Sequence, residues 1–308
     1  MSTHNHILVV RNGAIGDTVL LTPVLYGLRL AFPDHEIVLL GRYERVNLLV
    51  GPSFATRAFS FDQPGIHTLY GPQPALPPET HSLFATAELI LWYGEDEEGQ
   101  LQRNLKQLCP GQVLLRSPRG TGREHITEHL LQSLDRIGVP KPDSVPPLEV
   151  SRSMPTDLED LLSGPKRRGG LVVVHPGAGS VEKRLAPRIW AGVLLTMSRP
   201  DEFRVVVLSG PEEERLGIEL CEHACDLGPL LIHNRPLPDV AALLGNTDLF
   251  LGHDSGITHL AAAVGCRTVA VFRSTDPRVW APRGEHVRVV EIREEADALD
   301  LIISGISQ

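Results

Sequence analysis

The stretch GHDSGITHLAAAVG, residues 252–265, gathers polar side chains where an apolar strand would give way to a helix of small residues. The first amides of a helix lack partners and carry a partial positive charge, so a helix start binds anions. Gly256 allows an anion close to the backbone, Ser255 adds a hydroxyl, and His259 follows one turn later on the same side. With Asp254, these residues are predicted to hold a diphosphate. The alternative is that Asp254 or Ser255 only caps the helix and that His259 is a hydrogen-bonded core histidine.

A second glycine-containing loop, HPGAGSVEK (175–183), follows another apolar strand. Gly179 and Ser180 give this loop the freedom to wrap an anion, and Lys183 follows within reach of phosphate oxygens. We therefore predict that Gly179, Ser180 and Lys183 contribute to the same diphosphate site. Because most lysines are solvated surface residues, a lysine without a ligand is the alternative.

A third glycine turn, RNGAIGD (11–17), precedes the first helix of the chain. Gly13 and Gly16 permit a sharp turn, and Asp17 stands at the expected start of the helix. A carboxylate at this place could act as a general base, which typically contributes about 10²–10⁴-fold in rate. Aspartate is also a favoured N-cap, worth about 1 kcal/mol. The spacing alone does not decide between the two.

A basic segment lies around SPRGTGR (117–123), in the first half of the chain. Arg116, Arg119 and Arg123 would give this loop a positive charge suited to an anionic acceptor or to an anionic membrane surface. A solvated surface loop is the alternative. The acidic run at 95–98 is interpreted as a solvated turn, and no D-x-D, nucleophile-elbow, dinucleotide or P-loop motif occurs.

The elements that must position these loops are alternating strands and helices, which predicts an α/β fold with parallel sheets. Two doubly wound halves, residues 1–150 and 151–308, are expected on either side of a proline-rich linker at 140–150. Ligands of such sheets bind beyond the carboxyl ends of the strands, so a cleft between the halves is the expected site. In the first half we predict strands at 6–10, 36–40, 88–94 and 112–117, helices at 17–32 and 123–139, and a surface loop at 64–82.

The second half continues the same alternation after a short helix at 156–164. The apolar runs LVVVH, RVVVLSG, PLLIH, DLFLG and TVAVF are short and rich in β-branched residues, as buried parallel strands are. The predicted strands are 171–175, 204–210, 229–233, 248–252 and 268–272, with helices near 187–198, 212–225 and 238–245 and a helix from 255.

The bulk composition excludes several classes of protein. With 308 residues and a net charge of −9, the chain lacks the basic character of a nucleic-acid-binding protein. Its four cysteines form no C-x-x-C pair, which fits a reducing compartment and no metal site. No signal-peptide pattern is seen at the start, and no apolar run is long enough to span a bilayer. A cytoplasmic protein is therefore expected.

Taken together, the three glycine loops resemble the motifs of the heptosyltransferases, glycosyltransferase family 9. The G-D-x-x-x-x-x-P opening is similar to Gly16-Asp17-TVLLT-Pro23, and the H-P-G-A-G-S segment followed by lysine is found at 175–183. D-S-G-x-x-H-L-A-A-A corresponds to 254–263, and T-D-P-x-x-W-x-P corresponds to 275–282. The likeness covers most of the chain in the same order.

The resemblance implies a GT-B fold, with two Rossmann-like domains facing across a cleft. It implies that residues 1–150 hold the acceptor and residues 151–308 bind the nucleotide sugar. The activity implied is an inverting, metal-independent transfer of heptose or a related sugar from a nucleoside diphosphate sugar, usually ADP-heptose, to lipopolysaccharide or another glycan. No cofactor is implied beyond this co-substrate. A lipid-linked acceptor would be met at the inner face of the cytoplasmic membrane, by peripheral contact.

Within that resemblance, Asp17 is the expected catalytic base. Lys183 and the loop at 254–259 are expected to hold the donor diphosphate, with Gly13 and Gly16 in the acceptor-side loop. Glu213, in GPEEER, matches a G-P-x-[DE] pattern that points to nucleoside binding, although a charged helix start favoured by the dipole is an equal explanation.

The chain departs from the family pattern at two places. Leu185-Ala186 stands where Trp-Pro is usual after the lysine, and Arg273 stands where glycine is usual. These changes leave the sugar and the base of the donor open. Two other classes of function are considered: a non-catalytic nucleotide-sugar or glycan binding protein of the same fold, and a nicotinamide oxidoreductase, which the missing dinucleotide motif disfavours.

Overall fold

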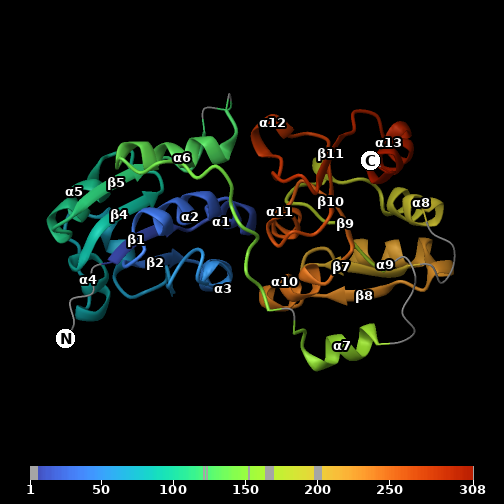
Figure 1. Ribbon diagram of the computed structural model, residues 1–308, viewed down its shortest axis with the longest axis horizontal. Coiled ribbons are helices and arrows are strands. Elements are labelled where there is room, and N and C mark those ends of the chain that lie inside the picture. Colours follow the sequence, from blue (N-terminus) through green and yellow to red (C-terminus); the bar gives the residue numbers. More distant parts are fainter. Residues whose placement is uncertain are drawn as a thin grey trace. The chain divides into compact units, whose positions relative to one another are not determined.

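The structure is a computed structural model of the chain and describes residues 6–120, 122, 124–151, 153–163, 170–197 and 203–307. The chain divides into two compact units, Met1–Glu149 (unit 1) and Val150–Gln308 (unit 2). Each unit is a parallel sheet with helices against it (Figure 1). The predicted α/β class is confirmed.

In the described part of unit 1, five parallel strands follow the order β3-β2-β1-β4-β5. The first strand of the chain lies in the middle, where Ile7 is in register with Ile37 on one side and Leu89 on the other. The direction of strand succession reverses beside β1, and such switch points are where α/β sheets bind ligands. The turn that carries Asp17 follows β1. The strands are β1 (His6–Arg11), β2 (Glu36–Gly41), β3 (Arg57–Ser60), β4 (Ala87–Tyr93) and β5 (Gln112–Arg116).

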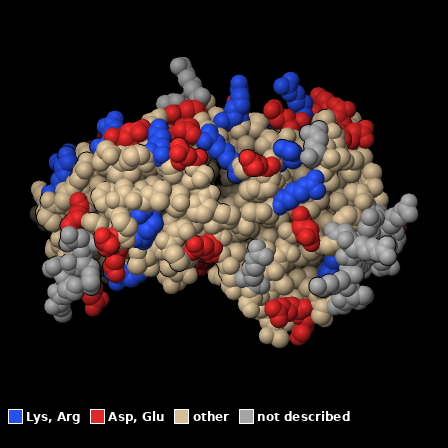
Figure 2. Space-filling view, viewed as in Figure 1, with Lys and Arg blue, Asp and Glu red and all other residues tan. Residues whose placement is uncertain are grey.

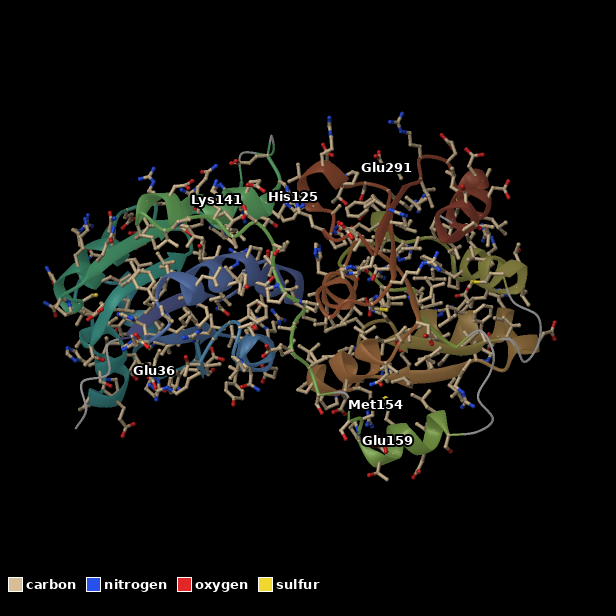
Figure 3. The ribbon with its side chains drawn as sticks, viewed as in Figure 1. Glu36, His125, Lys141, Met154, Glu159 and Glu291 are labelled. Atoms are coloured by element: carbon tan, nitrogen blue, oxygen red, sulfur yellow. The ribbon has the colours of Figure 1, made fainter. Side chains whose placement is uncertain are left out.

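Buried side chains that alternate along the strands of unit 1 pack on both faces of its sheet. Leu8 and Val10 belong to a cluster with Trp92 and Leu101, and Ile7 and Val9, which alternate with them along β1 and so point to the other face, are buried as well. His125 stands at the start of α6, where its ring accepts a hydrogen bond from the Thr127 amide (Figure 3). The helical segments are α1 (Ile15–Val19), α2 (Thr22–Ala31), α3 (Tyr43–Val46), η1 (Asn47–Leu49), η2 (Ile66–Tyr70), α4 (Pro78–Ala85), α5 (Gln100–Leu108) and α6 (Ile126–Arg136).

The helix predicted at 17–32 is two helices, α1 and α2. Proline has no N–H, so Pro23 cannot donate to the carbonyl of Val19. The hydroxyl of Thr22 donates to that carbonyl instead, at 2.9 Å. The single helix was therefore a wrong prediction, and α1 is a separate short segment directly after β1.

The surface loop predicted at 64–82 was also wrong in part. Ile66 and Leu69 of η2 are fully buried against the sheet, and α4 begins at Pro78. The prolines in this segment suggested an absence of regular structure. However, proline is well tolerated in the first turn of a helix, which is where Pro78 lies.

The sheet of unit 2 has six described strands in the order β11-β10-β9-β6-β7-β8, all parallel. Here β6 and β9 are the central pair, and succession reverses between them. Residues 176–184, called the glycine loop from here on, follow β6. The GHDSG corner (252–256) is formed by the end of β9 and the start of α11 (Gly256–Ala263), so both lie at this switch point. The strands are β6 (Leu171–His175), β7 (Arg204–Ser209), β8 (Leu230–His233), β9 (Leu249–His253), β10 (Thr268–Phe272) and β11 (Val287–Glu291).

One face of the unit 2 sheet is covered by α8, α9 and α13, whose buried residues include Trp190, Leu220 and Ile302. On the other face α10 and α11 lie next to each other. The last strand and helix, β11 and α13, were absent from the predicted series. The helical segments are α7 (Thr156–Leu162), η3 (Val181–Lys183), α8 (Pro187–Met197), α9 (Glu214–His223), η4 (Cys225–Leu227), α10 (Leu237–Gly245), α11 (Gly256–Ala263), α12 (Pro277–Trp280), η5 (Glu295–Asp297) and α13 (Ala298–Ser307).

Charged side chains are distributed without a large region of one sign on the face shown in Figure 2, where Lys or Arg and Asp or Glu alternate over short distances. Within the described ranges, no helix combines the length and the apolar composition needed to cross a bilayer.

Candidate functional site

The carboxyl edge of the unit 2 sheet brings together three loops that are distant in sequence. They follow β6, β9 and β10, and their contact point is the carboxylate of Asp254. Asp254 is 6% exposed. Its Oδ2 accepts a hydrogen bond from Lys183 Nζ at 2.6 Å and another from Thr275 Oγ1 at 2.7 Å.

Lys183 reaches this carboxylate from η3, the last turn of the glycine loop. Its side chain is partly accessible, with 25% of its surface exposed. A lysine carries three donors, and one of them is used on Asp254. The remaining donors can bind an anion at the surface. The predicted lysine is therefore fixed in place rather than free in solvent.

Helix α11 begins next to this ion pair. Ser255 is its N-cap, and its hydroxyl accepts a bond from the amide of Thr258 at 3.4 Å. The amides of Gly256 and Ile257 precede Thr258 and have no partner within the helix. Ser255 thus has the capping role offered as the alternative, while the start of α11 retains amides that can bind an anion.

His259 lies one turn into α11 and is buried, with 6% of its surface exposed. Its Nε2 is 4.0 Å from Asp254 Oδ1. The histidine therefore lies behind the carboxylate that holds Lys183. Asp254 and His259 are thus neighbours, whereas the hydroxyl of Ser255 contacts Thr258.

The glycine loop after β6 is open at its tip and tightly packed at its base. A Cβ on Gly179 would meet no atom within 4 Å, and Ser180 is half-buried. A Cβ on Gly177 would lie 2.2–2.5 Å from the carboxylate of Glu213. Gly177 is therefore required because Glu213 comes so close to the backbone.

Glu213 faces this loop rather than solvent, since its side chain is 15% exposed. Its Oε2 accepts from the Gly210 amide at 3.1 Å and lies 3.3 Å from His175 Nε2. Burial raises the pKa of Glu213, but its hydrogen bond to His175, the charge of that residue and the Gly210 amide outweigh burial, so the pKa is lowered overall. A carboxylate is thus kept ionised beside the glycine loop.

His253, the last residue of β9, is a structural residue. It is fully buried, its ring lies edge-on to Trp190, and its Nε2 accepts from the Leu185 amide at 2.8 Å. Burial, with the nearby charges of His175, Arg273 and Arg184, lowers its pKa to about 3. A neutral imidazole is therefore available to accept that bond.

The two departures from the family pattern occupy different places. Leu185 is 2% exposed and belongs to the core of unit 2, so it does not face the charged cluster. Arg273 donates through Nη1 to the carbonyl of Arg184 in the glycine loop. It therefore binds the loop's backbone.

In unit 1, Asp17 is not the N-cap of the first helix, as one interpretation of the sequence had it. The cap is Ala14, and Asp17 is the third residue of α1. Its Oδ2 accepts from the Ala14 amide at 2.9 Å, and its Oδ1 accepts from Arg11 Nη2 at 2.8 Å. Because a carboxylate has about four lone-pair positions, each oxygen can accept a further hydrogen bond. The side chain is 31% exposed.

The turn around Asp17 depends on its glycines and on two arginines. A Cβ on Gly13 would lie 2.6 Å from Asp17 Cβ, so this position requires glycine. Gly16 is buried within α1. Arg45 donates to the Gly13 carbonyl, and Arg11 is almost fully buried beneath the carboxylate.

The basic segment near 116–123 differs from its sequence-based expectation. Arg116 points inward, and its Nη2 donates to Gln132 Oε1 at 2.8 Å and approaches His129 Nδ1 at 3.3 Å. Arg119 is exposed. Arg123 lies outside the described residues. Arg116 is therefore a poor candidate for contact with an anionic partner.

Sequence reasoning missed three residues of these clusters. Thr275 and His175 lie inside quoted motifs but received no role, and Arg11 ends the first strand. The proximity of Thr275 to Asp254 and of His175 to Glu213 depends on strand order, which no local pattern reveals. Arg11 and Asp17 are only six residues apart, and their contact depends on the conformation of the turn between them. Among the described residues, no group of three or more His, Cys, Asp or Glu side chains is arranged to hold a metal ion.

Comparison with known proteins identifies the family. Residues 123–300, more than half of the chain, match glycosyltransferase family 9 (heptosyltransferase). Lipopolysaccharide heptosyltransferase 3 of Escherichia coli K12 is 23% identical over 88% of this chain and 83% of its own length.

Two further relatives match this chain over different shares of their length. Another Escherichia coli lipopolysaccharide heptosyltransferase 3 is 28% identical over 115 residues, which is 34% of either chain. The solved structure of Escherichia coli ADP-heptose lipopolysaccharide heptosyltransferase II has a TM-score of 0.71 and 18% identity, and the match covers 98% of this chain and 97% of that one. The chain belongs to glycosyltransferase family 9, the heptosyltransferase family, and is a transferase of the GT-B type.

Proposed function

We propose that this protein transfers heptose or a related sugar from a nucleoside diphosphate sugar, with ADP-heptose as the leading candidate, to lipopolysaccharide or another glycan. Transfer proceeds with inversion and without a metal ion. The observation that carries the proposal is the pairing of Lys183 with Asp254 at the start of α11. A cation and free helix amides at one place suit a diphosphate.

On the donor side, the diphosphate binds the amides of Gly256 and Ile257 and the free donors of Lys183. The hydroxyl of Ser255 and the open tip at Gly179 and Ser180 adjoin it. Asp254 cannot itself bind a phosphate, because two anions repel. It acts by holding Lys183, and its pairing offsets its own charge.

The nucleoside lies toward Glu213, whose ionised carboxylate accepts hydrogen bonds from ribose hydroxyls. Carboxylates are acceptors only, and paired hydroxyls are natural donors to them. Glu213 follows β7, whereas the diphosphate residues follow β6 and β9. Because these strands are neighbours in the sheet, one nucleotide can engage both places.

On the acceptor side, Asp17 takes the proton of the attacking hydroxyl. That oxygen forms a bond to the anomeric carbon while the bond from this carbon to the diphosphate breaks on the opposite face, so the configuration inverts. Lys183 and the α11 amides stabilise the charge that develops on the leaving diphosphate. Only the increase in charge on going to the transition state contributes to the rate.

The acceptor is a glycan, and a lipid-linked acceptor places the protein in the cytoplasm at the inner face of the membrane. The lipopolysaccharide acceptor is proposed because the relative in Escherichia coli K12 is a lipopolysaccharide heptosyltransferase. Peripheral membrane contact is part of this proposal. Exposed Arg119 is the described residue of the basic segment that remains available for it.

The proposal is tested by a thermal-shift panel of ADP, UDP and GDP and their sugars. A ligand that binds only the folded protein stabilises it by about 2.7 kcal/mol at 100 times its Kd. We expect ADP and ADP-heptose to raise the melting temperature of the wild type and to have a much smaller effect on Lys183→Met. Lys141→Met is the control, because Lys141 is in unit 1 and pairs with Asp135.

A non-catalytic nucleotide-sugar or glycan binding protein would give the same thermal shifts. Transfer or hydrolysis of the donor therefore has to be measured beside binding. Release of ADP from ADP-heptose that depends on acceptor supports the transferase, whereas binding without any release supports the binding protein.

A further inference from the structure

Two arginine side chains bind backbone carbonyls of the glycine loop, and the second arginine binds the backbone of the first. Arg184 donates to the carbonyl of Ala178 twice, from Nε at 3.1 Å and from Nη2 at 2.6 Å. Arg273, in the loop after β10, donates from Nη1 to the carbonyl of Arg184. The guanidinium groups thus connect the start of the glycine loop, its end and the loop after β10.

The two bonded carbonyls, of Ala178 and Arg184, lie on either side of the segment that carries Lys183. Between the two carbonyls, the loop is open: Gly179 has free space around it, and Val181 is 72% exposed. The other ties of the segment lie at its end, where the Leu185 amide donates to His253 and the Ala186 amide donates to Glu295. The Ala178 carbonyl depends on Arg184 alone for its side-chain partner among the described residues.

Within the described ranges, neither guanidinium takes part in an ion pair. Among the described residues, no carboxylate lies within 4.0 Å of the guanidinium of Arg184 or Arg273. Arg273 is half-buried, and its Nε is buried with no hydrogen-bond partner in the described part of the chain. The desolvation of Arg273 is therefore not offset by an ion pair. Its contribution to the structure comes from the hydrogen bond to the carbonyl that it binds.

We propose that Arg273 is a positioning residue for the glycine loop. It fixes the Arg184 carbonyl, and Arg184 fixes the Ala178 carbonyl. The loop is thereby ordered before a diphosphate binds to Lys183. This inference rests on the proposed donor function of the loop. A loop ordered before binding loses less conformational entropy when the ligand arrives, which raises affinity. A glycine at position 273 could not supply this bond.

The test combines amide hydrogen exchange of the ligand-free protein with calorimetric titration of ADP. In Arg273→Gly, we expect the amides of 178–184 to exchange at least about tenfold faster than in the wild type, because the loop opens more often. If the ordered loop then forms about a tenth of the population, ADP binds about tenfold more weakly. Arg273→Lys, which retains one donor, should restore part of both effects.

Arg278→Gly is the matched control. Arg278 lies five residues further along, is 88% exposed and pairs with Asp276, so its loss removes the same charge without touching the glycine loop. It should leave the exchange of 178–184 and the ADP affinity unchanged. If Arg273→Gly does not fold, Arg273→Lys and Arg184→Met give the same measurements.

The outcomes separate this inference from the proposed function. Unchanged exchange of 178–184 in Arg273→Gly overturns the positioning role. Weaker ADP binding with unchanged exchange also overturns it and indicates a direct phosphate contact by Arg273. Faster exchange in a protein whose wild type binds no nucleoside diphosphate supports the positioning role and contradicts the proposed donor site.

Discussion

Lys183 Nζ lies 2.6 Å from Asp254 Oδ2, although the two residues are 71 positions apart in the chain. The contact exists because β6 and β9 are neighbours at the centre of the unit 2 sheet. It places a cation beside the first amides of α11. The proposed phosphate site therefore depends on two loops that meet, and the following experiments address each part.

Asp254 is expected to act on the ligand through Lys183. Lys183→Met should weaken ADP binding roughly 10- to 100-fold, because it removes a charged hydrogen bond worth about 1.5–3 kcal/mol. Asp254→Asn should weaken binding less, by releasing the lysine. The double variant should bind no more weakly than Lys183→Met, a non-additivity that titration calorimetry can detect. Additive losses would show that Asp254 has an independent role.

Arg11 is expected to position Asp17 for catalysis. Arg11→Met removes the 2.8 Å bond to the carboxylate, and a base displaced by about 1 Å can cost roughly 100-fold in kcat. Arg11→Lys should be intermediate. In an Asp17→Asn background, Arg11→Met should produce no further loss of turnover. A further loss in that background would mean that Arg11 acts by some other route.

Ser255→Ala should destabilise unit 2 by removing the N-cap of α11. The expected loss is about 1 kcal/mol, which corresponds to roughly 2–4 °C in melting temperature for a unit of this size. Ser255→Thr retains the hydroxyl and should remain close to the wild type. Scanning calorimetry distinguishes the two, and equal stability of wild type and Ser255→Ala would argue against the capping role.

His253 makes stability depend on pH. Its pKa is about 3 in the folded protein and near 6.5 when unfolded, so the unfolded chain binds a proton first as the pH falls. Above pH 6.5 this group has no effect. As the pH falls from 6.5 to about 3, protonation of the unfolded chain lowers the free energy of unfolding by about 1.4 kcal/mol for each pH unit.

The control for this dependence is His253→Gln, whose amide oxygen can still accept from Leu185. Urea unfolding of wild type and variant at pH 7, 6, 5 and 4 gives the difference in slope. The variant should lose less stability on acidification than the wild type. Parallel slopes would show that His253 is not the titrating group.

The sequence predicted strands better than it predicted helices. The run LVVVH coincides with β6, because strands buried on both faces are continuous apolar runs. The edge strand β3 has only four residues, all at least partly exposed, and offers no such run. The break between α1 and α2 arises where Pro23 removes a donor, although the apolar spacing continues through it.

For the candidate site, the sequence located the loops but not their pairings. Asp254, Ser255 and His259 are close in sequence, so helical spacing alone grouped them. The contact of Thr275 with Asp254, by contrast, depends on β10 lying next to β9. The inward direction of Arg116 depends on the packing of α6, which a basic loop sequence does not reveal.

The most direct test of the whole account is turnover of ADP-heptose by Asp17→Asn, measured together with ADP binding. We expect the rate of sugar transfer to a lipopolysaccharide acceptor to fall about 10²–10⁴-fold, because the general base is lost, while the Kd for ADP stays within a factor of two or so of the wild type. Transfer by Asp17→Asn at the wild-type rate would contradict the account.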